Sequence, residues 1–571
     1  MKKLVSLLLC LAMLLSLTSA FAEVNHPDYI NYDSCLPIIK EGSDGEKITL
    51  KVAIAQDAVG GKWDDLWIKK FIEKYWNVNL EVEQIPAAGL TERVSLLFAS
   101  GELPDLMINL GLTTSNIYMY GQEESQLLKL DEYMDETLTP NILRRFEEHP
   151  DSRLASTTPD GHIYTLPKLG ESDDGTTLDR MSLNKAWLDA CGLKEPTTLD
   201  EFVDMLRAFK EKDPGNVGAE NVIPLGGGYE VPSQNPGWYI LNALGFNTDS
   251  NTGDNNCSYG TLPALLDGEV VLPAGHPLYK TYLETMKTLY DEGLISKNFF
   301  LLDSTEITGE MLNGYIGVVP ANRVDSYGVT NWTDWEALGA VTSETNPEAQ
   351  WFKPVSTEMV GNFAVSAQTK YPELCMRIAD YYFSDEARIA WIGPVDGSEE
   401  AMGYLGRTKV TTADSVASKP FDSSRFPKGI DNNWGYAVGC LTFFPKFGAV
   451  DMFDSILYYH KVYHEGEDAD PSVLNPEFPD HYFRLSGLEK LSGILESGFP
   501  VIYYLDSDDT YRLTELSTII DPYVKEQAAR FINGDRSLDE FDAYLSELDA
   551  MGFQEYQAIY QKVWENYQKN N

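Results

Sequence analysis

The chain has 571 residues, with 88 acidic side chains against 44 basic ones and a formal net charge of −44 at neutral pH. So negative a surface is expected to repel nucleic acids and anionic membranes, and it favours neutral or cationic ligands. The length exceeds what a single hydrophobic core usually organises, so at least two lobes are expected.

The first 22 residues have the pattern of an export signal. Lys2 and Lys3 supply positive charge, Leu4–Leu17 form an apolar run too short to span a bilayer, and Ala20-Phe-Ala22 is a small-x-small cleavage site. Cleavage there removes two lysines and takes the net charge from −44 to −46. We therefore predict an exported protein, with residues 23–46 as a polar leader segment.

The segment after this leader predicts alternating strands and helices. Ile48–Ala55 and Val78–Glu83 alternate apolar and polar residues, which indicates strands with one buried face, and Leu106–Asn109 is predicted as a third strand. Lys62–Trp76, with an aromatic residue at every fourth position, and Leu90–Gly101 are predicted as the intervening helices. The strand–helix–strand–helix–strand order indicates an α/β domain on a mainly parallel sheet.

Patterns further along the chain predict more elements of the same kinds. Thr198–Glu201 has the spacing of a capping box at the start of a helix, and Gly314–Val319 predicts a short strand. Asn362–Ser366 predicts another strand, and Tyr371–Phe383 predicts the helix after it. Ser537–Glu540 repeats the capping-box spacing, so the end of the chain is predicted to be helical.

Four short segments, taken in chain order, form a recognisable series. The first closes the second predicted helix and the third is predicted as the entry to a helix. They are Ala99–Asp105, Asp160-Gly-His-Ile-Tyr-Thr-Leu-Pro167, Met181–Leu188 and Pro196–Phe202. The series resembles the extracellular solute-binding proteins of ABC importers, in their large, maltose-binding-protein-like carbohydrate subgroup of Gram-positive bacteria. The resemblance covers residues 48–571, least clearly 395–500. It implies an α/β, two-lobed type II periplasmic-binding-protein fold with chain crossovers at a hinge and extra C-terminal helices.

The resemblance also implies how the chain is divided and what it does. Lobe 1 would comprise residues 47–182 and about 360–425, and lobe 2 would comprise 183–359 and about 426–571, with the first crossing near Asn184. The expected function is to capture a solute between the lobes and deliver it to an ABC permease, as a monomer without a cofactor. Neither Cys10 nor Cys35 is preceded by the residues of a lipid-anchoring site, so we expect an extracellular or surface-associated protein.

The aromatic content points to the ligand. With 11 Trp, 32 Tyr and 24 Phe, the chain has more rings than its helix stripes need, and sugar rings stack on such faces while their hydroxyls bond amides and carboxylates. An oligosaccharide is therefore the predicted ligand. The aromatic candidates, for which core packing is an equal alternative, are predicted to lie in or beside loops: Trp63, Trp238, Trp391, Trp434 and Tyr436. The polar candidates lie at loops that the family uses for ligand: Asp57, Asn109, Asn322 and Arg323.

Motifs for phosphate, metal or enzymatic chemistry are weak. Gly226-Gly-Gly228 lacks the Lys-Ser/Thr of a phosphate loop and is interpreted as a flexible loop. His460 and His464 have a spacing that zinc can use, but Lys461 stands where a metalloprotease has its glutamate, so two surface histidines are the simpler interpretation. A turn with oxygen donors at alternate positions is a weak calcium candidate: Asp249, Asn251 and Asp254.

Two other functions stay open from the sequence. A secreted glycan-active hydrolase would need only an Asp/Glu pair at the correct separation, which a sequence this acidic cannot reveal. A peptide-binding importer component would use the same fold. The five cysteines after the signal form no metal-binding spacing, so most are expected to be small buried residues: Cys35, Cys191, Cys257, Cys375 and Cys440.

Overall fold

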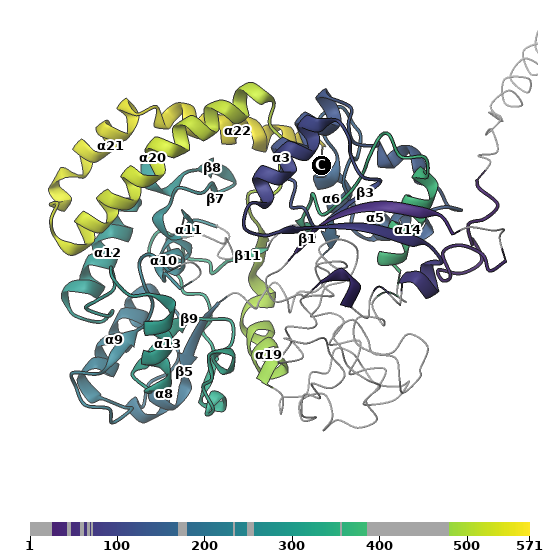
Figure 1. The fold of residues 1–571 in the computed structure, drawn as a ribbon. Coiled ribbons are helices and arrows are strands. Elements are labelled where there is room, and N and C mark those ends of the chain that lie inside the picture. Colours follow the sequence, from purple (N-terminus) through teal and green to yellow (C-terminus); the bar gives the residue numbers. More distant parts are fainter. Residues whose placement is uncertain are drawn as a thin grey trace, which may run out of the picture.

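The structure is a computed structural model that describes residues 26–42, 47–56, 62–65, 69, 72–169, 180–231, 234–247, 256–353, 357–384, 387 and 479–570. Within these ranges the chain forms two α/β lobes, and helices from the end of the chain lie along one side of them (Figure 1). None of the helices in the described part combines the length and apolar composition that crossing a membrane requires.

The first lobe is built on a four-stranded sheet in the order β13–β3–β1–β2. Its strands are β1 (Thr49–Gln56), β2 (Asn79–Pro86), β3 (Leu106–Ile108) and β13 (Phe363–Val365). β1 pairs in parallel with β2 and with β3, and β13 runs antiparallel to β3. The predicted strands and the parallel core of this sheet are therefore confirmed.

Helices cover this sheet where chain segments return from one strand to the next. They are α3 (Leu90–Ser100), α4 (Thr114–Ile117), α5 (Pro140–Glu148), α6 (Pro150–Ser156) and α14 (Pro372–Tyr382). α3 ends as predicted, because Gly101 adopts a left-handed φ of 67° and donates its N–H to the Phe98 carbonyl at 3.1 Å.

The helix predicted over residues 62–76 is wrong as a single regular helix. Its described residues are helical but of different types: a 3₁₀ turn, η1 (Trp63–Asp65), an α-helical Lys69, and a π-helical turn, η2 (Ile72–Trp76). Trp63, Ile72 and Trp76 are buried. Of the four aromatic residues in the predicted stripe, Trp63 is buried and Tyr75 is half buried, so the period did not fix the backbone hydrogen-bond pattern of the segment.

The second lobe has a four-stranded sheet in the order β10–β5–β9–β6. Its strands are β5 (Met181–Asn184), β6 (Ile223–Leu225), β9 (Ile316–Pro320) and β10 (Trp335–Ala337). β6 and β9 are parallel, whereas β5 runs antiparallel to both of its neighbours. Its helices are α8 (Lys185–Cys191), α9 (Leu199–Lys212), α10 (Gly237–Ala243), α11 (Asn256–Tyr259), α12 (Tyr279–Asp291) and α13 (Ser304–Leu312).

Two sequence predictions for this lobe can be compared with the structure. The segment predicted to enter a helix does so: it begins as strand β5, and Asn184 then caps α8 by accepting the Trp187 N–H at 3.2 Å. The predicted capping box of α9 is half formed. Thr198 accepts the Glu201 N–H at 3.2 Å, but the Glu201 carboxylate accepts from the Thr197 N–H at 2.8 Å.

The end of the chain is helical, as predicted, and its helices pack on elements of the second lobe. α20 (Ser507–Asn533) packs on α12, and α22 (Phe553–Asn570) packs on α20, on α21 (Phe541–Ala550) and beside the hairpin β7–β8 (Ala264–Leu266 and Glu269–Val271). α19 (Pro479–Leu491) covers the edge strand β10, where the Ser486 hydroxyl accepts the Ala337 N–H at 2.7 Å.

Two short ribbons mark where the chain passes between the lobes. β4 (Lys168–Leu169) pairs with β12 (Thr357–Met359), and β11 (Trp351–Lys353) pairs with β14 (Leu495–Ser497). One crossing connects β4 to β5, and the return connects β11 to β12. β11 accordingly lies between the two lobes in Figure 1.

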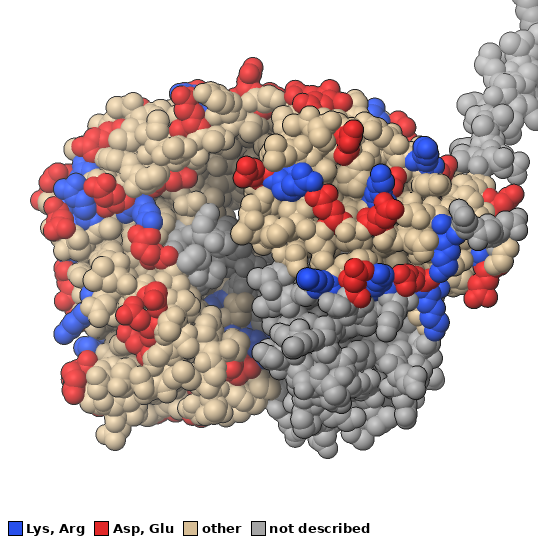
Figure 2. Space-filling model, viewed as in Figure 1, with Lys and Arg blue, Asp and Glu red and all other residues tan. Residues whose placement is uncertain are grey.

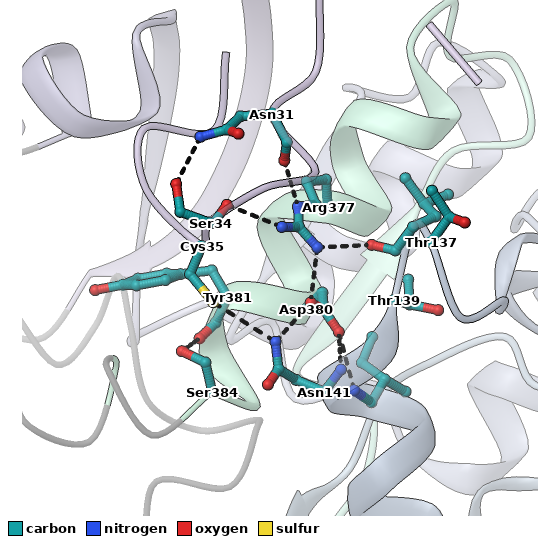
Figure 3. A network of polar contacts seen from close by, with 12 residues as sticks. Asn31, Ser34, Cys35, Thr137, Thr139, Asn141, Arg377, Asp380, Tyr381 and Ser384 are labelled. Carbon is teal, nitrogen blue, oxygen red and sulfur yellow. Dashed lines mark hydrogen bonds and ion pairs between the residues drawn. The ribbon is translucent and has the colours of Figure 1, made fainter. Parts of the chain in front are cut away.

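A buried ion pair joins three distant segments of the first lobe (Figure 3). Arg377 of α14 donates to the backbone carbonyls of Asn31 and Ser34 at 3.1 and 3.0 Å, and to Asp380 at 3.1 Å. Asp380, which is fully buried, also accepts the N–H groups of Asn141 and Ile142 at the start of α5 at 2.8 and 2.9 Å. Part of the predicted leader is thereby tied into the lobe.

The first testable prediction concerns this pair. Asp380→Ala leaves Arg377 and two helix-end amides buried without their acceptor, so the free energy of unfolding should fall by about 3–5 kcal/mol. Denaturant titration measures the loss. Asp204→Ala is the matched control, because Asp204 and Arg207 form an exposed pair at the same spacing, and its loss should stay below about 1 kcal/mol. Equal losses in the two variants would contradict the prediction.

Candidate functional site

The candidate site lies where parallel strands of the two lobes end. In α/β sheets, ligands bind beyond the carboxyl ends of the strands. In the first lobe these are the ends of β1, β2 and β3, and in the second lobe the ends of β6 and β9. The molecular surface is hollowed between the two lobes (Figure 2). A cleft bounded by these two edges is therefore the site that the fold offers.

The first-lobe edge is built tightly around Asn109, the residue directly after β3. Asn109 is 3% exposed, has a left-handed φ of 55°, and donates its N–H to the Asn362 carbonyl at 2.8 Å. The Leu112 N–H donates to the Gly361 carbonyl at 3.1 Å, and a Cβ at Gly361 would lie only 1.9 Å from the Leu112 carbonyl oxygen. Glycine at this position lets the chain entering β13 pass against the end of β3.

Trp63 lies near the same edge but is packed inward. The Trp63 backbone N–H donates to the Gln84 side-chain oxygen at 2.7 Å, near the carboxyl end of β2. The indole is 7% exposed and belongs to the apolar core of the first lobe. In this conformation the ring contributes to packing, the alternative that the sequence left open.

The second-lobe edge begins with Asn322 and Arg323, which follow β9 as expected. Asn322 is exposed. The half-buried Arg323 guanidinium donates to both carboxylate oxygens of Asp325, at 3.0 and 2.6 Å. This two-pronged pair holds the side chain in place and neutralises much of its charge, so the loop is suited to hydrogen-bond polar, uncharged groups.

Sequence reasoning missed Tyr327 and Gln234 at this edge. Tyr327 lies in η6 (Val324–Tyr327), and burial raises the pKa of its hydroxyl, an effect partly offset by the Gln234 side chain beside it. Gln234 follows β6 and is 3% exposed. Only the rule that ligands gather after parallel strands could have singled out these two residues among many similar ones.

The glycine run after β6 is packed, so its interpretation as a flexible loop is wrong. All three glycines are buried, and the Gly228 N–H donates to the Gln234 carbonyl at 3.1 Å. Gly227 has a φ of 133°, and a Cβ there would lie 2.3 Å from the same carbonyl oxygen. The glycines are needed because the segment carrying Gln234 returns against their backbone.

Trp238 does not lie in a loop. It is the second residue of α10, is 4% exposed, and meets Tyr239 and Trp351 edge to face, with ring centroids 5.9 and 5.5 Å apart. A Pro-Gly pair preceded it in the sequence and suggested a turn, but the same pair also precedes a helix start. The structure places this ring in the core of the second lobe.

Several predicted residues lie outside the described ranges, and the structure gives no position for them: Asp57, Trp391, Trp434, Tyr436, Asp249, Asn251, Asp254, His460, His464 and Cys440. In the part of the chain that is described, no cluster of three or more metal-binding side chains occurs. Cys191, Cys257 and Cys375 are buried, and Cys35 is half buried.

One carboxyl group has the pKa that acid catalysis would require. Burial, and secondarily the charge of Glu306, raises the pKa of Glu310 to about 7. Glu310 lies near the end of α13, whose chain turns at Gly314 into the amino end of β9, and the Tyr315 N–H donates to the Glu310 carbonyl at 3.1 Å. It therefore lies toward the opposite edge of the sheet from Asn322, away from the cleft.

Two α/β lobes that are joined by crossing strands and separated by a polar-edged cleft define a two-lobed solute-binding protein of the periplasmic-binding fold. The family described as bacterial extracellular solute-binding protein matches residues 67–417, and the chain belongs to this family.

Relatives with described ligands match over nearly the whole chain. The fructooligosaccharide ABC transporter substrate-binding protein FusA of Streptococcus pneumoniae is 24% identical over 541 residues, covering 92% of this chain and 91% of FusA. An HMO-binding solute-binding protein of Bifidobacterium longum infantis is 21% identical, with a TM-score of 0.71 over 92% of this chain and 99% of that one. FusA in complex with kestose is 20% identical, with a TM-score of 0.62 over 92% and 100% of the two chains.

The second testable prediction separates core tryptophans from surface ones. Trp238→Ala should lower the free energy of unfolding by about 3–5 kcal/mol, because it empties a packed position in the second-lobe core. Trp332→Ala is the comparison, since Trp332 is only half buried, and it should cost about 1 kcal/mol. Chemical denaturation of both variants measures this. A Trp238→Ala protein as stable as Trp332→Ala would contradict the core assignment.

Proposed function

We propose that the protein is the exported substrate-binding component of an ABC importer and that it captures a neutral oligosaccharide in the cleft between its lobes. The observation that carries this proposal is the pair of polar edges, after β3 on one lobe and after β9 on the other, on two lobes that are joined by crossing strands. The match to FusA over nearly the full length of both chains supports it.

Charge supports the choice of a neutral sugar. The printed chain carries a net charge of −44, which repels polyanionic sugars such as uronates. Arg323, which follows β9, is held by Asp325. Asn109, Asn322, Gln234 and Tyr327 instead offer amide and hydroxyl groups, which suit sugar hydroxyls.

The proposed mechanism is binding coupled to lobe closure, without a covalent step. A ligand that contacts both edges binds the closed arrangement more tightly than the open one, and it shifts the equilibrium by that difference. The closed form would then dock on the membrane permease. We propose the division into lobes near residues 182 and 360 as the basis of this motion, supported by β5 belonging to the second sheet and β13 to the first.

The hydrolase alternative receives less support from the described residues. Glu310, whose pKa burial raises to about 7, lies toward the edge of its sheet away from the cleft, and Glu306 caps the start of α13 by accepting the Asp303 N–H at 3.0 Å. The peptide-binding alternative uses the same cleft, so only a ligand panel separates it. An export signal at residues 1–22 and retention at the cell surface belong to the same proposal.

The third testable prediction is a ligand panel. Calorimetry of the mature protein should give saturable one-to-one binding to one class of neutral oligosaccharide, with kestose and longer fructooligosaccharides tested first. Oligogalacturonides and peptides should not compete, and chromatography should recover the sugar uncut. Cleavage of the sugar, or binding to peptides alone, would contradict the proposal.

The fourth prediction tests the second-lobe edge. Tyr327→Phe removes one hydroxyl from the proposed cleft and should weaken sugar affinity about tenfold, the size of one lost hydrogen bond of about 1.4 kcal/mol. Tyr290→Phe makes the same change on α12, away from the cleft, and should leave affinity unchanged. Titration calorimetry measures both, and equal affinities for the two variants would remove Tyr327 from the site.

A further inference from the structure

The segment between β14 and α20, residues 498–506, contacts both lobes. It leaves the ribbon β11–β14, contains no helix or strand from residue 502 to 506, and leads into α20 on the second lobe. We use the name strap for residues 499–507, which include Ser507, the first residue of α20. Because side chains of an extended chain alternate in direction, neighbouring residues of the strap can face different lobes.

The tyrosines at 503 and 504 do face different lobes. Tyr503 packs with Phe499 and with Tyr560 of α22, at ring-centroid distances of 5.9 and 6.2 Å. Tyr504 packs against an apolar cluster of the first lobe that includes Leu110 and Leu112, which follow β3. Burial raises the pKa of Tyr504, in agreement with a ring inserted between packed elements. The strap thus reaches an apolar cluster of the first lobe to which the segment after β3 also contributes.

A polar contact lies beside this packing. The Ser507 hydroxyl bonds the Glu123 carboxylate of η3 (Tyr118–Glu123), at 3.3 and 3.4 Å to its two oxygens. Ser507 is the first residue of α20, so the carboxylate of the first lobe also lies at the positive end of a helix of the second. Burial, and then the charges of Glu123 and Asp506, raises the pKa of Tyr118, which places all three groups close together.

The strap is fixed on its second-lobe side. Asp506 caps α20 by accepting the Asp509 N–H at 2.8 Å. Lys562 of α22 forms ion pairs with Asp506, at 3.3 Å, and with Asp509. The start of α20 is therefore held to α22, so a change in its contact with Glu123 requires the lobes to move relative to each other.

We propose that the strap is a device that sets the balance between open and closed lobes, and through it the affinity for the ligand, although its residues need not touch the ligand. Tyr504 and Glu123 are positioning residues in this account. The effect on affinity rests on the proposed function, whereas the effect on lobe arrangement does not. Loss of either contact should let the lobes separate further.

Small-angle X-ray scattering of the ligand-free mature protein tests the device without any sugar. Tyr504→Ala and Glu123→Ala should each increase the radius of gyration relative to the unsubstituted protein. Tyr504→Phe is the control for the first, because it keeps the ring and removes a hydroxyl that bonds none of the described residues. Glu124→Ala is the control for the second, because Glu124 bonds Gln126 within its own lobe. Both controls should scatter like the unsubstituted protein.

A second readout connects the strap to binding. For the sugar that the unsubstituted protein binds, Tyr504→Ala should weaken affinity about tenfold, because the closed state becomes harder to populate. A radius of gyration that is unchanged or smaller in both alanine variants overturns the proposal. If circular dichroism shows that Tyr504→Ala does not fold, the radius of gyration of Glu123→Ala, a change at an exposed side chain, alone decides whether the proposal holds. If the alanine variants show the expected increase in radius of gyration but the unsubstituted protein binds no sugar, the proposed function is overturned and the role of the strap in lobe arrangement is supported.

Discussion

The sheet of the first lobe is completed by a strand that comes from a distant part of the chain. β13 joins β3 only after the chain has built the whole sheet of the second lobe, from β5 to β10. The first lobe is therefore not a continuous segment, and the chain has to cross between the lobes more than once. Rotation of one lobe against the other is the motion that such a two-lobed fold permits most easily.

The lobes themselves are built to resist deformation. The buried Arg377–Asp380 pair ties the N-terminal segment and two helices of the first lobe together. Close backbone approaches at Gly361 and Gly227 fix the loops at the two edges of the cleft. Because packing already holds these loops in place, little binding free energy is needed to order them when a ligand binds. The strap adds a contact whose strength can tune closure independently of the site.

Local patterns predicted the parts of the fold that local physics decides. Alternating apolar residues and the glycine at the end of α3 placed β1, α3 and β3 correctly, because each signal and the element it specifies lie in the same short segment. The same reasoning placed Asn109 at the end of a strand, whereas Asn322 was chosen from the family resemblance. Whether a given tryptophan packs inward, however, depends on partners far away in the sequence. Trp238 meets Trp351, and no pattern near Trp238 reveals that contact.

The strap was invisible in the sequence for a similar reason. Tyr503 and Tyr504 are adjacent among 32 tyrosines, and only the three-dimensional arrangement of α22 and the first lobe gives them opposite roles. The glycine run at 226–228 was also misjudged, because its sequence predicts a flexible loop whereas all three residues are buried in the fold. In the fold the backbone of Gly227 adopts a conformation that glycine tolerates, which lets the Gln234 carbonyl pass close to it.

The central claim is that one sugar contacts both lobes at once. A crystal structure of the mature protein with its tightest-binding oligosaccharide tests this most directly. The account predicts an intact sugar in the cleft, in contact with the loop after β3 and with the loop after β9. A sugar bound to one lobe alone, or one found cleaved, would contradict it.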